Sequence, residues 1–231
     1  MNTPLAVLFR DDDYVAIHKP PGLLVHRTWL ASRAEEFAVQ RLRDQLQRRV
    51  YPLHRLDRAT SGVLLFALSP EAASRLGPAF DQHRVERRYR AVVRGWVDDE
   101  GLIEHPVRDR DEGGGPRPAA TRYRCLARVE IPEPVDRYPC ARYSLVEVRP
   151  LTGRRHQIRQ HFKHVGHPLI GDTSYGKGSH NRFFRARYGL DRLLLEAREL
   201  RFTHPVDGRE VRITTPPDAA WSRVVDLFGT G

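Results

Sequence analysis

An uninterrupted apolar run, GVLLFAL at residues 62–68, constrains the fold of this chain more than any other feature. The run is far too short for a helix that crosses a membrane. Its continuous apolar character is typical of a central strand that is buried on both faces. The segment HRLDRATS, residues 54–61, places ionisable side chains directly before this strand. The sequence therefore predicts a charged cluster at the edge of a buried strand.

The remaining elements follow from hydrophobic periodicity and from turn signals. Strands are expected within 14–26, on both sides of a Pro-Pro-Gly turn, and at 87–97, 121–131 and 141–150. Asp207-Gly208 predicts a closing hairpin. Helices are expected at 34–49, after the N-cap Ser69 with a kink or break at Gly77-Pro78, at 152–166, and within the closing segment DAAWSRVVDLF.

Scattered strands that outnumber the helices predict an α+β fold, with a mixed, largely antiparallel sheet and flanking helices. We expect residues 1–231 to form one domain, with a mobile surface loop at 98–119. The N-terminal segment lacks the basic start and long apolar core of a signal peptide.

The formal net charge of +10 and the sequence pI near 10.2 favour a polyanionic partner, most often a nucleic acid. The alternatives are a membrane surface, for which no basic amphipathic helix is visible, and a basic surface that serves solubility alone. Cys125 and Cys140 are the only cysteines, and their spacing indicates neither a zinc site nor a disulfide framework. We expect a cytoplasmic protein without cofactor or metal and without an obligate protein partner.

Asp57 lies between Arg55 and Arg58 in the segment before the buried strand. Nearby positive charge favours an ionised carboxylate, which can act as a nucleophile or a base. Ser61 and Gly62 are small enough to let a substrate approach the backbone. The alternative is a structural cluster of surface charges with a capped turn.

The segment TGRRHQIRQHFKHVG repeats basic residues at helical spacing, at Arg155, Arg159 and Lys163. Such a stripe can bind phosphates, or one of its arginines can reach a buried carboxylate. The alternative is an ordinary solvated face of the helix. The histidines at 156, 161, 164 and 167 lack the spacing of a metal site. Tyr89, beside arginines at the start of a strand, can stack on an unpaired base or belong to the core.

Together these segments resemble, in their order along the chain, the motifs of the pseudouridine synthases of the RluA-like family. HRLDRATSGVLLFAL resembles the central motif, YVAIHKPPGLLVH the N-terminal turn and ERRYRAVVRG the tyrosine-bearing strand. LTGRRHQIRQHFKHVGHPLIGDTSYG resembles the arginine helix with its following loop, and LLLEARELRFTHPVDG the closing hairpin. His18 stands where asparagine is common in the family.

The resemblance implies a cofactor-free isomerisation of uridine to pseudouridine in RNA. It implies Asp57 as the catalytic carboxylate, Tyr89 as the active-site tyrosine and Arg159 as the basic residue paired with the aspartate. It further implies that substrate contacts come from Arg55, which helps to displace the target base, and from His54, Thr60, Arg154, Arg155 and His156.

Three segments, LLVHRTWL, DRYPCARYSLVEV and GSHNRF, resemble the members of the family that modify uridine 65 of tRNA. No separate N-terminal RNA-binding domain is expected. The alternatives are an rRNA-directed enzyme of the same chemistry and a non-catalytic RNA-binding protein, which would not need Asp57, Tyr89 and Arg159 together.

Overall fold

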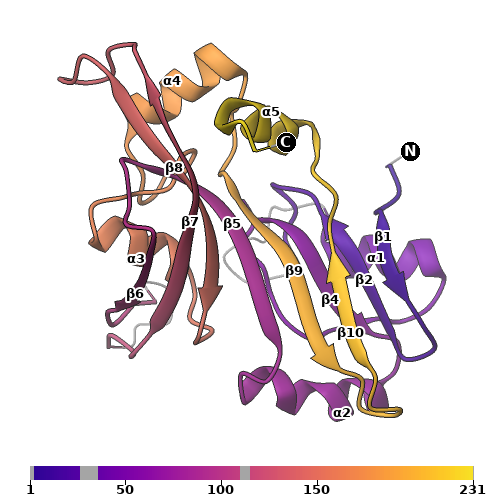
Figure 1. Cartoon of the computed structure of the whole chain (residues 1–231). Helices are drawn as coiled ribbons and strands as arrows, with labels where there is room; N and C mark the ends of the chain where they lie inside the picture. Colours follow the sequence, from indigo (N-terminus) through magenta and orange to yellow (C-terminus); the bar gives the residue numbers. More distant parts are fainter. Residues whose placement is uncertain (1–2, 27–35, 110–114, 231) are drawn as a thin grey trace. The chain divides into compact units, whose positions relative to one another are not determined.

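The computed structural model describes residues 3–26, 36–109 and 115–230 (Figure 1). The chain forms two compact units. Unit 1 comprises residues 1–87 and 197–215, and unit 2 comprises residues 88–196 and 216–231. Whether the chain folds as the single domain expected from the sequence stays a prediction. Among the described residues, no helix is long and apolar enough to cross a membrane.

Unit 1 contains strands in the sheet order β1 (Val7–Arg10), β2 (Tyr14–Lys19), β4 (Ser61–Ala67) and β9 (Leu195–Thr203), and β2 is antiparallel to both β1 and β4. β3 (Tyr51–Pro52) pairs with β4, and β10 (Glu210–Thr214) pairs with β9. Every residue of β4 is buried, which confirms the central strand predicted from the apolar run. The elements α1 (Ala38–Leu46) and α2 (Pro70–Asp81) complete the unit.

α2 begins as predicted, because the Ser69 side chain accepts a hydrogen bond from Ala72 N and Pro70 occupies the first turn. The predicted break at Gly77-Pro78 is wrong, since the helix runs through Pro78 to Asp81, and a kink there stays a prediction. Pro78 has no N–H to donate to the carbonyl of Ser74, but Ser74 is exposed to water. The helix also ends three residues after Pro78, so the proline interrupts few hydrogen bonds. The predicted second strand at 23–26 is also absent from the described residues, where Leu24 forms only an isolated bridge.

Unit 2 carries an antiparallel sheet in the order β5 (Glu86–Arg94), β8 (Ala141–Pro150), β7 (Ala120–Ile131) and β6 (Glu100–Glu104). Its helices are α3 (Gln157–His164), α4 (Gly178–Tyr188) and α5 (Ala219–Phe228). Tyr143, Phe184 and Trp221, each with no exposed surface, join α4 and α5 to the sheet in one apolar core. The fold class predicted from the sequence is confirmed.

Three features of unit 2 differ from the sequence-based expectations. Residues 98–119, expected to be a loop, contain strand β6 and an isolated pairing of Val107 with Arg117; the mobility of this segment stays a prediction. α3 begins at Gln157 rather than near residue 152, and α4 was not predicted. In α5 the buried side chains are Trp221, Val224 and Phe228.

Candidate active site

The backbone around Asp57 is held by a buried lysine. Lys19 lies at the end of β2 and has no exposed surface. Its Nζ donates to the carbonyl oxygens of Pro20 at 2.8 Å, Leu23 at 2.8 Å and Arg58 at 3.2 Å. An ammonium that is removed from water must find acceptors for its protons, and three carbonyls supply them. Lys19 thereby ties the Pro-Pro-Gly turn to the residue that follows Asp57.

Backbone hydrogen bonds fix the same loop from both sides. Gly22 N donates to the Arg58 carbonyl at 2.8 Å, and Arg58 Nε donates to the Gly22 carbonyl at 3.0 Å. Thr60 N donates to the Asp57 carbonyl at 3.0 Å and closes a turn in front of β4. Asp57 itself is half-buried, Thr60 is buried and Arg55 is exposed. The loop therefore presents the Asp57 carboxyl group from a rigid backbone.

Gly62 serves the sheet rather than a substrate. Its φ is +111°, a conformation that residues with a side chain rarely adopt. A Cβ atom at this position would overlap the backbone of Ala197 in β9. The close approach that the sequence predicted for a substrate is thus taken by the neighbouring strand.

His54 is built into the support of this loop. Leu65 N donates to His54 Nε2 at 3.1 Å, and the imidazole stacks on Phe80 with ring centroids 5.1 Å apart. Burial, with a smaller contribution from the positive charge of Arg87, lowers the pKa of His54 to about 3. The ring is therefore neutral at physiological pH, with its second nitrogen carrying the proton. Its predicted contact with substrate stays a prediction.

The neutral state of His54 gives a testable acid sensitivity. Below pH 6.5 His54 of the unfolded chain gains a proton, whereas folded His54 stays neutral until about pH 3. The free energy of unfolding should then fall with pH in this window, by up to about 1.4 kcal/mol per pH unit from this residue. Urea denaturation of wild type and His54→Gln between pH 7 and pH 4 measures the difference. If the free energies of unfolding of wild type and His54→Gln fall in parallel with pH, the predicted contribution of His54 is refuted. His26→Gln is the matched control, because His26 is exposed.

Tyr89 lies on β5 in unit 2, directly opposite Val148 of β8. Val148 in turn faces Tyr123 of β7, which packs against Phe162 of α3 with ring centroids 5.4 Å apart. Tyr89 is 8% exposed. The side chain is thus largely buried, and any substrate contact is limited to a small part of it.

Gln157 anchors the turn that carries the predicted phosphate-binding residues. Its Oε1 accepts from Thr152 Oγ1 at 2.6 Å and from Arg154 N at 3.0 Å. Its Nε2 donates to Ala120 O and Thr121 Oγ1, both at 2.9 Å. This buried amide fixes the turn onto β7. Arg154, Arg155 and His156 therefore precede α3, and the predicted helical stripe does not include Arg155.

His156 occupies the N-cap position of α3 with φ +53°, a left-handed conformation that is uncommon for a residue with a side chain. Its Nδ1 lies 3.2 Å from the hydroxyl of Tyr175. Strained backbone of this kind is frequent at functional sites. Arg154 is exposed, which suits the predicted contact with RNA, whereas Arg155 donates from Nη1 to Asp109 Oδ1 at 3.1 Å.

Arg159, the third predicted catalytic residue, is buried in α3 and forms a two-pronged ion pair with Asp172. Nε donates to Oδ2 at 2.7 Å, and Nη2 donates to Oδ1 at 2.9 Å. The guanidinium carbon also lies 5.1 Å from the ring centroid of Tyr175. The pairing of Arg159 with Asp57, which lies in the other unit, stays a prediction.

The segment after β6 is fastened along α3. Arg108 N donates to Gln160 Oε1 at 3.2 Å, and Gln160 Nε2 returns a hydrogen bond to the Arg108 carbonyl at 3.1 Å. His161 Nε2 donates to the His105 carbonyl at 2.9 Å, and the His105 and His164 rings stack 3.5 Å apart. Residues 105–109 are therefore part of the structure around α3.

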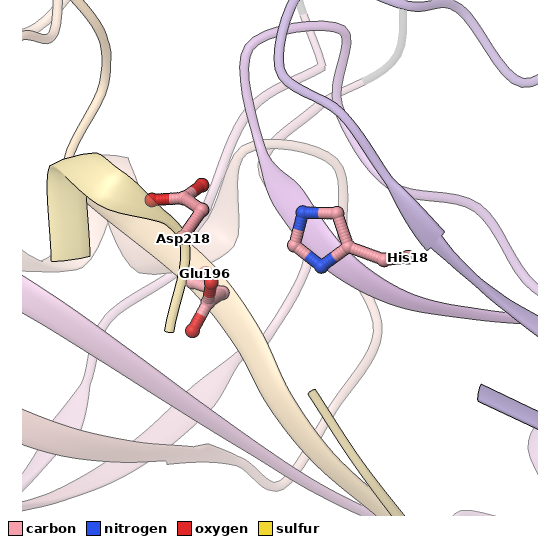
Figure 2. A group of neighbouring side chains, drawn as sticks. All are labelled: His18, Glu196 and Asp218. Atoms are coloured by element: carbon pink, nitrogen blue, oxygen red, sulfur yellow. The ribbon is translucent and has the colours of Figure 1, made fainter. Parts of the chain in front are cut away.

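His18, Glu196 and Asp218 are of residue types that can ligate a metal ion. Each of them also has a hydrogen-bond partner within the protein. Figure 2 shows Glu196, on β9, and Asp218, the N-cap of α5. Arg90 Nε donates to Glu196 Oε2 at 2.6 Å, and Asp218 accepts from Arg192 Nη1 at 2.5 Å and from Trp221 N at 2.9 Å. His18, also in Figure 2, has its Nδ1 2.5 Å from Thr215 Oγ1.

The sequence did not reveal four residues that hold the predicted site residues in place: Lys19, Gln157, Asp172 and Tyr175. A polar residue in a turn or at a helix start gives no signal of burial. The sequence HPLIGDTSYG did offer one clue, because the glycines at 171 and 176 bracket Asp172 and Tyr175. Glycines at both ends of a short loop favour a tightly folded backbone with fixed side chains.

A family model described as RNA pseudouridylate synthase matches residues 13–164. This range contains Asp57, Tyr89 and Arg159.

Curated relatives match over nearly the whole chain. The protein of Haemophilus ducreyi named tRNA pseudouridine synthase C is 46% identical over 233 residues, which cover 97% of this chain and 96% of the relative. The Vibrio vulnificus protein of the same name is 43% identical over 233 residues, with 97% and 95% covered. Among solved structures, human RNA pseudouridylate synthase domain containing 1 is 27% identical, has a TM-score of 0.73, and covers 98% of this chain and 95% of its own.

Proposed function

Because the chain belongs to the RNA pseudouridylate synthase family, we propose that it is a tRNA pseudouridine synthase that converts uridine 65 into pseudouridine. The proposal rests first on the family match, which contains all three predicted catalytic residues. The names of the curated relatives, which cover nearly the full chain, support tRNA as the substrate. The specific position, uridine 65, rests on the segment resemblances within 23–30, 136–148 and 178–183.

The proposed reaction is an isomerisation, so every atom of the uridine is retained. The bond between nitrogen 1 and the anomeric carbon of the ribose breaks, the uracil rotates, and carbon 5 bonds to the anomeric carbon. Carbon 5 then loses its proton and nitrogen 1 carries one. No redox change occurs and no group is transferred to a second molecule, so the proposal requires no cofactor.

Asp57 is the proposed catalytic carboxylate, and two routes are open to it. In one route it attacks the anomeric carbon and forms a covalent intermediate. In the other it assists removal of the 2′ proton as the base leaves, which forms a glycal, and the proton returns to carbon 2′ when carbon 5 adds to the anomeric carbon. Both routes need an ionised carboxylate held in a fixed direction. The hydrogen bonds from Lys19 Nζ and Gly22 N to the Arg58 carbonyl hold the backbone beside Asp57 and support its role as the catalytic carboxylate.

The remaining roles follow from the side chains. Tyr89 is proposed to contact the uracil and to serve in proton transfer, and Arg55 to help displace the target base. Arg154, Arg155 and His156 are proposed to bind RNA phosphates before α3, and His54 and Thr60 to contact the substrate from the Asp57 loop. The target must leave the base stack, which costs about a few kcal/mol and which such contacts offset in part.

The net charge of +10 supports a nucleic-acid substrate, and tRNA in the cytoplasm is its proposed partner. An rRNA-directed enzyme of the same chemistry is the second candidate, because the basic surface and the catalytic residues fit both substrates.

One experiment separates these substrates. The purified protein is incubated with an unmodified tRNA transcript containing uridine 65, with the same transcript carrying cytidine there, and with large-subunit rRNA transcripts. Pseudouridine is mapped by chemical blocking and primer extension. We expect a new stop one nucleotide 3′ of position 65 in the first transcript alone. Modification of rRNA without modification of tRNA would overturn the tRNA assignment, and no modification in any RNA would overturn the catalytic proposal.

A further inference from the structure

Asp172 pairs with the predicted catalytic residue Arg159 and accepts hydrogen bonds at both carboxylate oxygens. It has 1% of its surface exposed. Oδ2 accepts Arg159 Nε, and Oδ1 accepts Arg159 Nη2 together with the backbone N–H groups of Ser174 and Tyr175, each at 2.9 Å. Burial alone would raise the pKa of Asp172, but the hydrogen bond and charge of Arg159 and the two backbone donors outweigh it and lower the pKa. Asp172 is therefore an anion at neutral pH.

The loop that carries Asp172 is built to hold one geometry. Gly171 has φ +77°, and a Cβ there would overlap the carbonyl of Arg192. A Cβ on Gly176 would overlap the Asp172 carbonyl. Asn181, from α4, donates to the Asp172 carbonyl at 2.9 Å and accepts from Gly171 N at 2.8 Å. The glycine conformations and the donors to the carboxylate thus leave it little freedom to move, whereas Asn181 bonds only the backbone of the loop.

The contact with Asp172 determines the direction of the Arg159 guanidinium. A guanidinium has five N–H donors in a planar fork. Asp172 takes the Nε–H and one Nη2–H, which fixes the plane, and the Tyr175 ring lies against the guanidinium. The donors that Asp172 does not use, on Nη1 and Nη2, then point in one fixed direction.

Holding α3 in place does not require such a pair. Ile158 and Phe162 already bury the apolar side of the helix. A buried ion pair contributes little net stability compared with apolar residues of the same size, because both charges lose their hydration. The pair is better explained by the orientation that it imposes than by its contribution to folding.

We propose that Asp172 is a positioning residue that orients Arg159 for catalysis. This inference rests on the proposed function, in which Arg159 acts with the catalytic carboxylate. Asp172 touches neither the target uridine nor the phosphates in this proposal. It acts only through Arg159, so its loss should impair turnover and leave RNA binding unchanged.

Asp172→Asn is the principal test, because asparagine keeps the size and removes the anion. We expect kcat on the tRNA transcript to fall about 10²-fold, the loss typical of a misplaced catalytic group, with Kd for the same RNA unchanged within about twofold. Asp172→Glu keeps the charge but shifts it by one methylene, and should give an intermediate loss of kcat if Asp172→Asn does not fold.

Asn181→Ala is the matched control, because it removes two hydrogen bonds from the same loop and leaves the carboxylate in place. Its kcat should stay within about threefold of wild type at a temperature where both variants are folded. Equal losses of kcat in Asn181→Ala and Asp172→Asn would overturn the proposal, because loop stability would then explain both. A wild-type kcat in Asp172→Asn would also overturn it.

A second readout does not depend on activity. The Arg159 Nε–H should give a slowly exchanging ¹⁵N-¹H NMR signal, assigned by its absence in Arg159→Lys. We expect this signal to persist in Asn181→Ala and to disappear in Asp172→Asn. Persistence in Asp172→Asn would overturn the orientation argument. If wild-type protein forms no pseudouridine in any RNA while the signal behaves as expected, the proposed function fails and the ordering of Arg159 by Asp172 stands.

Discussion

Replacement of Asp57 by asparagine is expected to lower the rate of pseudouridine formation at least about 10³-fold, within the range of about 10² to 10⁴ for one acid or base group. Asparagine has nearly the same shape, but it can neither attack the anomeric carbon as an anion nor accept a proton. The loop around residue 57 is held by Lys19 and by backbone hydrogen bonds that do not use the carboxyl group. The Kd for tRNA should therefore change by less than about twofold.

Single-turnover assays with excess enzyme measure the chemical step, and filter binding measures the Kd. Asp81→Asn, at the exposed end of α2, is the control and should match wild type in both. An active Asp57→Asn variant would refute the role of Asp57 in either chemical route. A large loss of binding with an unchanged rate on bound RNA would make Asp57 an RNA contact.

The sequence is sufficient to predict the Asp57 loop and the strand behind it, for a local physical reason. β4 is buried along its whole length, so an unbroken apolar run is its direct consequence. The turn before it is closed by neighbours in the chain, Asp57 and Thr60. Patterns of this kind depend on short-range geometry and on burial, and both are visible in a single sequence.

The environment of Arg159 shows what a single sequence cannot predict. Arg159 and Gln157 are polar residues of α3, and helical periodicity assigns such residues to a solvated face. They are buried because their partners, which include Asp172 for Arg159 and Thr121 for Gln157, come from other elements. The helix at 178–188 escaped prediction for a related reason, since only His180 and Phe184 are buried among its arginines.

Replacing Arg159 by alanine is expected to have the second large effect, and it acts on stability as well as on chemistry. The variant leaves Asp172 ionised, buried and without its counter-charge. Breaking a buried ion pair in this way typically costs about 3–5 kcal/mol of the free energy of unfolding. Urea denaturation near neutral pH measures this cost. Activity of the folded fraction should also fall more than tRNA binding, because the proposed role of Arg159 is in the chemical step.

Two further variants decide whether the buried charge is the cause. Arg155→Ala breaks the pair with Asp109, whose side chain is 17% exposed, and should cost only about 1 kcal/mol or less. The double variant Arg159→Ala/Asp172→Asn removes both charges and should recover a large part of the lost stability without recovering activity. If the double variant is as unstable as Arg159→Ala, the cost comes from lost packing of the arginine. If it regains activity, Arg159 does not take part in the reaction, because only the damage caused by the unpaired carboxylate would have been repaired.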